Sequence, residues 1–124
     1  MGIQNDLLGN PGVTAASAIY EYRLLESATF PTVQHTSADT DKPMGVALAD
    51  AATGEAVQYA KLDGGIYTVV ADDAISKHAN IVPSTAGRVK TAATGDFIIG
   101  YALEAATAQD DNIRCVLFHG ETSA

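Results

Sequence analysis

The chain contains the same sequence pattern twice. Residues 44–64 read MGVALADAATGEAVQYAKLDG, and residues 99–120 read IGYALEAATAQDDNIRCVLFHG. At an offset of 55 residues both share Gly-x-Ala-Leu-x-x-Ala, which begins at Gly45 and again at Gly100. One residue inserted in the second copy then changes the offset to 56. Because two copies of so long a period are too few for a solenoid, the repeat predicts one compact domain built from two equivalent units.

The match continues upstream of this segment. At the offset of 55, Thr36, Ala38 and Asp41 meet Thr91, Ala93 and Asp96. A looser match pairs Ala18-Ile19 with Ala74-Ile75, and Leu24-Leu25 with Ile81-Val82. We therefore place the two pseudo-repeats at about residues 18–65 and 74–120, within a single β domain of residues 18–124. Residues 1–17 have no evident counterpart in the second copy, and we expect them to form an extended N-terminal arm.

The local signals are those of β-strands. Residues 20–25 alternate with the period of two that is typical of strands. Residues 56–62 and 112–118 carry apolar groups on both faces, which is typical of strands that are covered on both sides. Asp63-Gly64-Gly65 predicts a hairpin that leads into a further strand over residues 66–70.

Helical signals are weak. Residues 72–79 begin with two aspartates suited to an N-cap, but they have no wide apolar stripe and support only a turn or two. Short strands at regular spacing predict a small barrel or sandwich. We therefore expect an all-β fold made of two pseudo-repeated units, with one short helical turn and the N-terminal arm.

Composition and charge exclude several classes of function. The 124 residues include 15 acidic and 7 basic ones, a net charge of −8. Such a surface repels phosphate groups, so we expect neither nucleic-acid binding nor binding to an anionic membrane. The core should be thin because there is no Trp, and thin cores are often completed by oligomerisation. Cys115 is alone, cannot form an intrachain disulfide, and is predicted to be a small buried hydrophobe.

The sequence offers no set of residues suited to catalysis or metal binding. The three histidines follow no metal-ligand spacing; they are His35, His78 and His119. Asp72-Asp73 and Asp110-Asp111 are adjacent pairs, and neighbouring residues on a strand point to opposite faces. Phosphate-binding, dinucleotide-binding and serine-hydrolase motifs do not occur. We therefore expect a non-enzymatic protein without catalytic residues, cofactor or metal, and without a secretory signal.

Several short motifs resemble those of one protein family in their order and spacing. They are Gly45-Val46-Ala47-Leu48, Gly54-Glu55-Ala56-Val57, Asp63-Gly64-Gly65, Ala74-Ile75, Gly87-Arg88-Val89 and Gly100-Tyr101-Ala102-Leu103. Together they resemble the capsid decoration, or cement, proteins of tailed bacteriophages, which are small duplicated β proteins. The resemblance covers residues 18–120 and implies a β-tulip-like barrel. Many family members have a glycine after Ala-Ile, whereas this chain continues with residues 76–80, where local helical structure would fit.

The resemblance implies a virion protein on the outer capsid surface, made in the host cytoplasm, that clamps neighbouring major capsid subunits together. Its expected partners are the major capsid protein and other copies of itself, as a homotrimer or homodimer. The apolar side chains expected to contact the capsid or a sister copy are Ile3, Leu7, Leu8 and Phe30, although packing on the chain's own barrel would also account for them.

Two other functions remain open. The first is a virion fibre or receptor-binding β module, which needs exposed aromatic groups; the tyrosines available for it are Tyr20, Tyr22, Tyr67 and Tyr101. The second is a small enzyme or ligand carrier, which needs a cavity with convergent polar groups.

Overall fold

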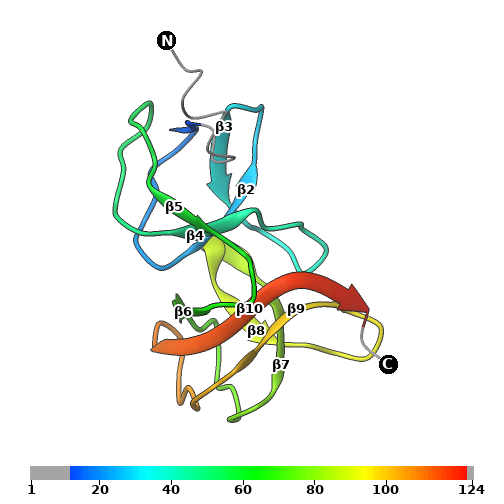
Figure 1. The fold of residues 1–124 in the computed structure, drawn as a ribbon. Coiled ribbons are helices and arrows are strands. Elements are labelled where there is room, and N and C mark those ends of the chain that lie inside the picture. Colours follow the sequence, from blue (N-terminus) through cyan, green and yellow to red (C-terminus); the bar gives the residue numbers. More distant parts are fainter. Residues whose placement is uncertain (1–11, 123–124) are drawn as a thin grey trace.

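The computed structural model describes the backbone of residues 12–122 and the side chains of residues 12–118. Its first five strands are β1 (Thr14–Ala15), β2 (Leu24–Ser27), β3 (Thr32–His35), β4 (Gly45–Ala47) and β5 (Tyr59–Lys61). The next five are β6 (Ile66–Val70), β7 (Asn80–Pro83), β8 (Val89–Thr91), β9 (Phe97–Ala102) and β10 (Asn112–Thr122). They form two five-stranded sheets, β1-β3-β2-β4-β5 and β6-β10-β9-β7-β8, which Figure 1 shows as upper and lower parts of the molecule. The all-β prediction is confirmed.

We call residues 12–61 the first half and residues 66–122 the second half. Their strand registers repeat. Gly45 of β4 pairs with Lys61 of β5, and Gly100 of β9 pairs with Leu117 of β10. These pairs are related by the offsets of 55 and 56 seen in the sequence. The two halves are therefore pseudo-repeats at the level of hydrogen bonding, as the sequence predicts.

The two glycines explain why this pattern recurs. A Cβ atom on Gly45 would lie 2.5 Å from the carbonyl oxygen of Ala60, and one on Gly100 would lie 2.0 Å from that of Val116. Neither separation is compatible with a side chain. In both halves the glycine thus allows a neighbouring strand to approach closely.

Upstream of these strands the equivalence holds with a corrected register. Leu25 pairs with Gly45, and Ile81 pairs with Gly100. Leu25 therefore corresponds to Ile81 at an offset of 56, one residue away from the alignment that matched Leu24-Leu25 with Ile81-Val82. That alignment was wrong because an apolar pair in a strand that is buried on both faces gives no register signal.

The repeat also begins earlier than the sequence suggests. Val57 N–H donates to Val13 C=O, and Ala15 N–H donates to Glu55 C=O. The second half has the same arrangement, because Ala71 N–H donates to Asp111 C=O. Residues 12–15 thus correspond to residues 68–71, and β1 is the counterpart of the end of β6. Residues 1–11 of the predicted arm lie outside the described residues.

Three local predictions are wrong: a strand over residues 20–23, a hairpin at residues 63–65 and a helical turn over residues 72–79. Residues 20–23 form a loop, and β2 starts only at Leu24. Asp63-Gly64-Gly65 does not close a hairpin: β6 pairs with β10 and not with β5, so this turn carries the chain from one half to the other.

Residues 72–79 are not helical. Ile75 forms a β-bridge with Ala106 in the middle of this segment, and that pairing overrides the weak helical signal. Among the described residues the one helical turn is a 3₁₀ turn, Thr85–Gly87.

Each half has its own hydrophobic core, and the two cores correspond position by position. The ten equivalent pairs are Val13/Val69, Ala15/Ala71, Ile19/Ile75, Leu25/Ile81, Val33/Val89, Met44/Ile99, Ala47/Ala102, Ala51/Ala106, Val57/Ile113 and Tyr59/Cys115. Cys115 is fully buried, as predicted, and burial raises the pKa of its thiol to about 12.

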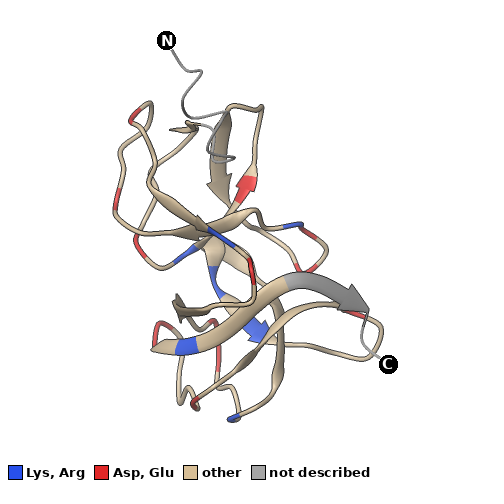
Figure 2. Ribbon diagram, viewed as in Figure 1, with Lys and Arg blue, Asp and Glu red and all other residues tan. Residues whose placement is uncertain are grey.

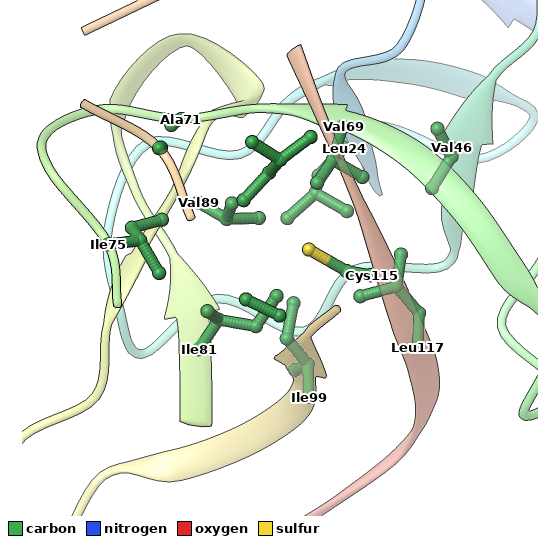
Figure 3. Close-up of a cluster of buried hydrophobic side chains, with 13 residues drawn as sticks. Leu24, Val46, Val69, Ala71, Ile75, Ile81, Val89, Ile99, Cys115 and Leu117 are labelled. Atoms are coloured by element: carbon green, nitrogen blue, oxygen red, sulfur yellow. The ribbon is translucent and has the colours of Figure 1, made fainter. Parts of the chain in front are cut away.

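The second core also takes two side chains from the first half. Leu24 of β2 and Val46 of β4 pack among the second-half residues, as Figure 3 shows around Val69, Cys115 and Leu117. Their neighbours in sequence, Leu25 and Ala47, face the core of the first half. Strands β2 and β4 are therefore buried on both faces and join the two halves into one body.

Candidate functional site

The described residues include no group of three or more His, Cys, Asp or Glu side chains placed to hold a metal ion. The adjacent carboxylates have separate structural partners. Asp72 accepts hydrogen bonds from Ser84 Oγ (2.5 Å) and Gln109 Nε2 (2.9 Å), whereas Asp73 accepts from the N–H of Ala74.

The carboxylates of the other acidic pair, Asp110-Asp111, also have separate partners. Asp110 Oδ1 lies 2.8 Å from Arg88 Nε. Asp111 Oδ2 instead accepts hydrogen bonds from the N–H and hydroxyl groups of Thr107, which hold the pKa of this carboxyl below its usual value. These carboxylates organise loops.

A polar contact joins the 3₁₀ turn of the second half to the first half. The buried hydroxyl of Thr36 donates to Ser84 C=O (3.1 Å), and Gly87 N–H donates to Thr36 C=O (3.0 Å). Gly87 has a φ of 72°, and a Cβ there would lie 2.8 Å from His35 Nδ1 and from Arg23 Cβ. Only a glycine allows the halves to approach this closely.

Charged and aromatic side chains surround this contact. Arg23 donates to Ala86 C=O (3.0 Å) and lies 3.9 Å from Asp110, while its guanidinium is 5.6 Å from the ring centre of Tyr20. His35 stacks on Tyr20 and accepts a hydrogen bond from its N–H (3.2 Å). Burial lowers the pKa of His35, and the positive charge of Arg23 lowers it further. These residues fix the relative position of the two halves.

A pocket of about 310 Å³ opens elsewhere between the halves. Its eight lining residues are Lys42, Pro43, Met44, Lys61, Leu62, Phe97, Ile99 and Phe118. At the offsets of 55 and 56, three pairs among them are equivalent: Lys42 with Phe97, Met44 with Ile99, and Leu62 with Phe118. The walls are mainly apolar, and two lysines are the charged groups among these residues. Sequence reasoning missed this pocket.

Figure 2 shows Lys and Arg positions at the junction of the two halves, with Asp and Glu positions both there and on the outer loops. The pocket itself combines mainly apolar walls with two lysines. No helix in the described part of the chain is long and apolar enough to span a membrane.

One of the four predicted contact residues can be located. Phe30 lies in the turn between β2 and β3 and is 57% exposed. The adjacent Pro31 C=O accepts from the N–H of Thr14 (3.1 Å), so Phe30 is close to the start of the described chain. Ile3, Leu7 and Leu8 lie outside the described residues.

The four tyrosines proposed for receptor binding do not share a surface role. Tyr20 stacks on His35, and the hydroxyl of Tyr67 lies within hydrogen-bond distance of Lys61 C=O and the Asp63 carboxylate. Tyr22 is half-buried at a φ of 68°, and Tyr101 is exposed on β9. Two of them are thus engaged in local structure.

Comparison with known proteins identifies a matching protein family and a solved structure with a similar fold. The family model described as phage cement protein matches residues 12–117. Among solved structures, the N base of the head fibre protein gp8.5 of bacteriophage phi29 matches with a TM-score of 0.75 and 21% identity. That match covers 91% of this chain and 96% of the phi29 chain. Comparison with curated protein sequences yields no match.

Proposed function

Because this chain belongs to the phage cement protein family, and is thus a structural protein of the virion, we propose that it binds the outer capsid surface and clamps neighbouring major capsid subunits together. The observation that carries the proposal is the family match over residues 12–117, which includes both halves. The fold supports it: the halves share a core through Leu24 and Val46, so the protein is suited to bear load between two attachment points.

The proposed contacts are apolar. Ile3, Leu7 and Leu8 in the N-terminal segment and the exposed ring of Phe30 contact the capsid or a sister copy. The protein acts as a homotrimer or homodimer made in the host cytoplasm. Because many copies bind one lattice, modest single contacts give lasting attachment.

The test is addition of the purified protein to expanded heads that lack it. Binding should saturate at a fixed stoichiometry and raise the temperature at which the heads disrupt. Phe30→Asp should weaken binding without changing the melting temperature of the isolated protein. Ile66→Asp is the matched control, because Ile66 is similarly exposed (66%) but lies in the second half. Heads that take up no protein, or heads that are not stabilised by it, would refute the clamp.

The structural likeness to the phi29 head fibre base favours a second candidate, a module that attaches a fibre to the head. A fibre base would occupy heads without raising their disruption temperature. The same experiment therefore separates the two functions.

A further inference from the structure

The pocket between the halves is walled by residues that belong to both cores. Met44 packs against the core of the first half, whereas Leu62 packs against the core of the second. Ile99, which also lines the pocket, is a buried member of the second core. The packing that holds the fold therefore also holds these walls, and the pocket is preformed, as sites for small ligands usually are.

The pocket has the size and the walls to take one large apolar side chain. Its volume of about 310 Å³ lies at the lower end of the range for small-ligand sites, about 300–1,000 Å³. Phe97 lines it and is still 41% exposed, so its ring lies where the pocket opens. Water in such an apolar space finds few hydrogen-bond partners, and an apolar side chain displaces it favourably.

The charge around the pocket has one sign. Lys42 and Lys61, both exposed, are the charged residues among the eight that line it, and no Asp or Glu is among them. None of the ion pairs within residues 12–118 involves Lys42. Two ammonium groups beside an apolar cavity favour a ligand that carries a carboxylate next to its apolar group, and they disfavour a cationic one.

From the apolar walls and the like charge of the two lysines we propose that the pocket binds a segment of a partner protein in which a large apolar side chain is followed by a carboxylate. The apolar side chain fills the cavity against Met44 and Leu62, and the carboxylate lies at the opening near Lys42. The inference deepens the proposed function and rests on it for the source of the segment, the major capsid protein. The pocket then gives the clamp an attachment point separate from Phe30, which lies in the turn between β2 and β3.

Binding of dipeptides to the isolated full chain tests the ligand chemistry. The probe is phenylalanyl-aspartate with an acetylated N-terminus and an amidated C-terminus, followed by NMR. The backbone amide shifts of Met44, Leu62 and Ile99 should change saturably. The matched neutral probe, with asparagine in place of aspartate, should bind about 2–10-fold more weakly, because an exposed ion pair contributes a factor of about 1.5–5 for each lysine.

One pair of variants tests the apolar wall. Phe97→Ser should weaken binding of the acidic dipeptide about fivefold or more, because the ligand loses an aromatic wall. Tyr101→Ser is the matched control, since Tyr101 is an aromatic residue of the same strand with similar exposure (37%) that does not line the pocket. It should leave the affinity unchanged.

A second pair tests the charge. Lys42→Gln should weaken binding of the acidic dipeptide about 2–5-fold and reduce its advantage over the neutral probe. Lys77→Gln, at an exposed lysine outside the pocket, should change neither. Lys42 is chosen because the charge of Lys61 also acts on Asp63, whose pKa is lowered mainly by its hydrogen bond with Tyr67 and to a smaller extent by that charge.

Several results would overturn the proposal. They are the absence of saturable shifts, equal affinity for the acidic and neutral probes, equal losses in Phe97→Ser and Tyr101→Ser, and tighter binding of the short fatty acid hexanoate than of the dipeptide. The source of the segment is tested with heads. Phe97→Ser combined with Lys42→Gln should lower uptake by heads, and the combined control variant, Tyr101→Ser with Lys77→Gln, should not. Equal uptake of the parent and the pocket variant would exclude the capsid as the source, whereas heads that take up no parent protein would refute the clamp and leave the dipeptide result in place.

Discussion

The equivalent outer faces of the two sheets have opposite surroundings. In the first half, Leu24 and Val46 are buried against the core of the second half. Their counterparts in the second half, Asn80 and Tyr101, are exposed. Ten interior positions are shared between the halves while these outer ones differ, so the union of the halves depends on a few apolar side chains that only the first half carries. The difference shows that two β-units with matching internal packing can be joined into a single body by side chains on one outer face.

The largest loss of stability is expected at the two equivalent glycines, where the halves are most alike. Gly100→Ala would place a Cβ 2.0 Å from the Val116 carbonyl oxygen, whereas Gly45→Ala would place one 2.5 Å from that of Ala60. Both force a strand to move, and the tighter site should lose about 3–5 kcal/mol of unfolding free energy. Gly45→Ala should lose less. Chemical denaturation measures both, and a Gly100→Ala protein as stable as the parent would mean that the close strand approach is wrong.

The next largest loss of stability is expected at Leu24, one of the side chains that join the halves. Leu24→Ala removes a fully buried side chain from the second core and should cost about 2–5 kcal/mol. The matched control is Asn80→Ala at the equivalent exposed position, which should change stability by about 0.5 kcal/mol or less. Both proteins should unfold in one transition. Two separate transitions in Leu24→Ala would show that the halves are independent domains.

Much of this architecture could be predicted from the sequence because backbone constraints leave a trace in it. Gly45 and Gly100 mark the close strand approach in each half, and the change of offset from 55 to 56 appears in both the sequence and the strand register. The family resemblance rests on the same motifs, and the match over residues 12–117 confirms it.

What could not be predicted depends on pairing between distant segments. Asp63-Gly64-Gly65 has the composition of a hairpin, yet the partner of β6 is β10, which lies far along the chain. The pocket was missed for a similar reason, since Leu62 and Phe118 come together only when the halves pack. Thr36 and Ser84, the two buried polar residues of the contact between halves, likewise give no local signal.

A smaller loss of stability is expected at a turn in which the two halves carry different residues. Asp110 has a φ of 71° and corresponds to Gly54, which has a φ of 84°. Asp110→Gly removes the ion pair with Arg88 but relieves the left-handed backbone, so the net loss should be less than about 1 kcal/mol. Because Asp110 is more than half exposed, added salt should reduce the difference from the parent. Denaturation at low and high ionic strength measures it, and a loss that does not change with salt would contradict an electrostatic origin.

The smallest expected effect is a pH dependence of stability that arises in the first half and not at the equivalent position of the second. His35 pairs opposite Leu25, and Thr91 pairs opposite the equivalent Ile81. The strand register thus makes Thr91 the counterpart of His35, so its match with Thr36 in the sequence was wrong, and Thr91 does not titrate. Burial and the nearby Arg23 and Arg88 hold the pKa of His35 below its ordinary value of about 6.5. The folded protein therefore takes up this proton less readily than the unfolded chain. Its contribution to stability is fully present above about pH 6.5 and is lost as the pH falls from there towards the folded-state pKa.

His35→Gln should flatten this part of the stability profile. The control is His78→Asn, which removes an exposed histidine at a φ of 70° that asparagine also tolerates; it should keep the parent's profile. Urea denaturation at several pH values between 5 and 8 provides the comparison. A parent protein whose stability does not fall below pH 6.5, or a His35→Gln variant with the parent's slope, would mean that Arg23, Arg88 and Asp110 join the halves without any influence from the imidazole between them.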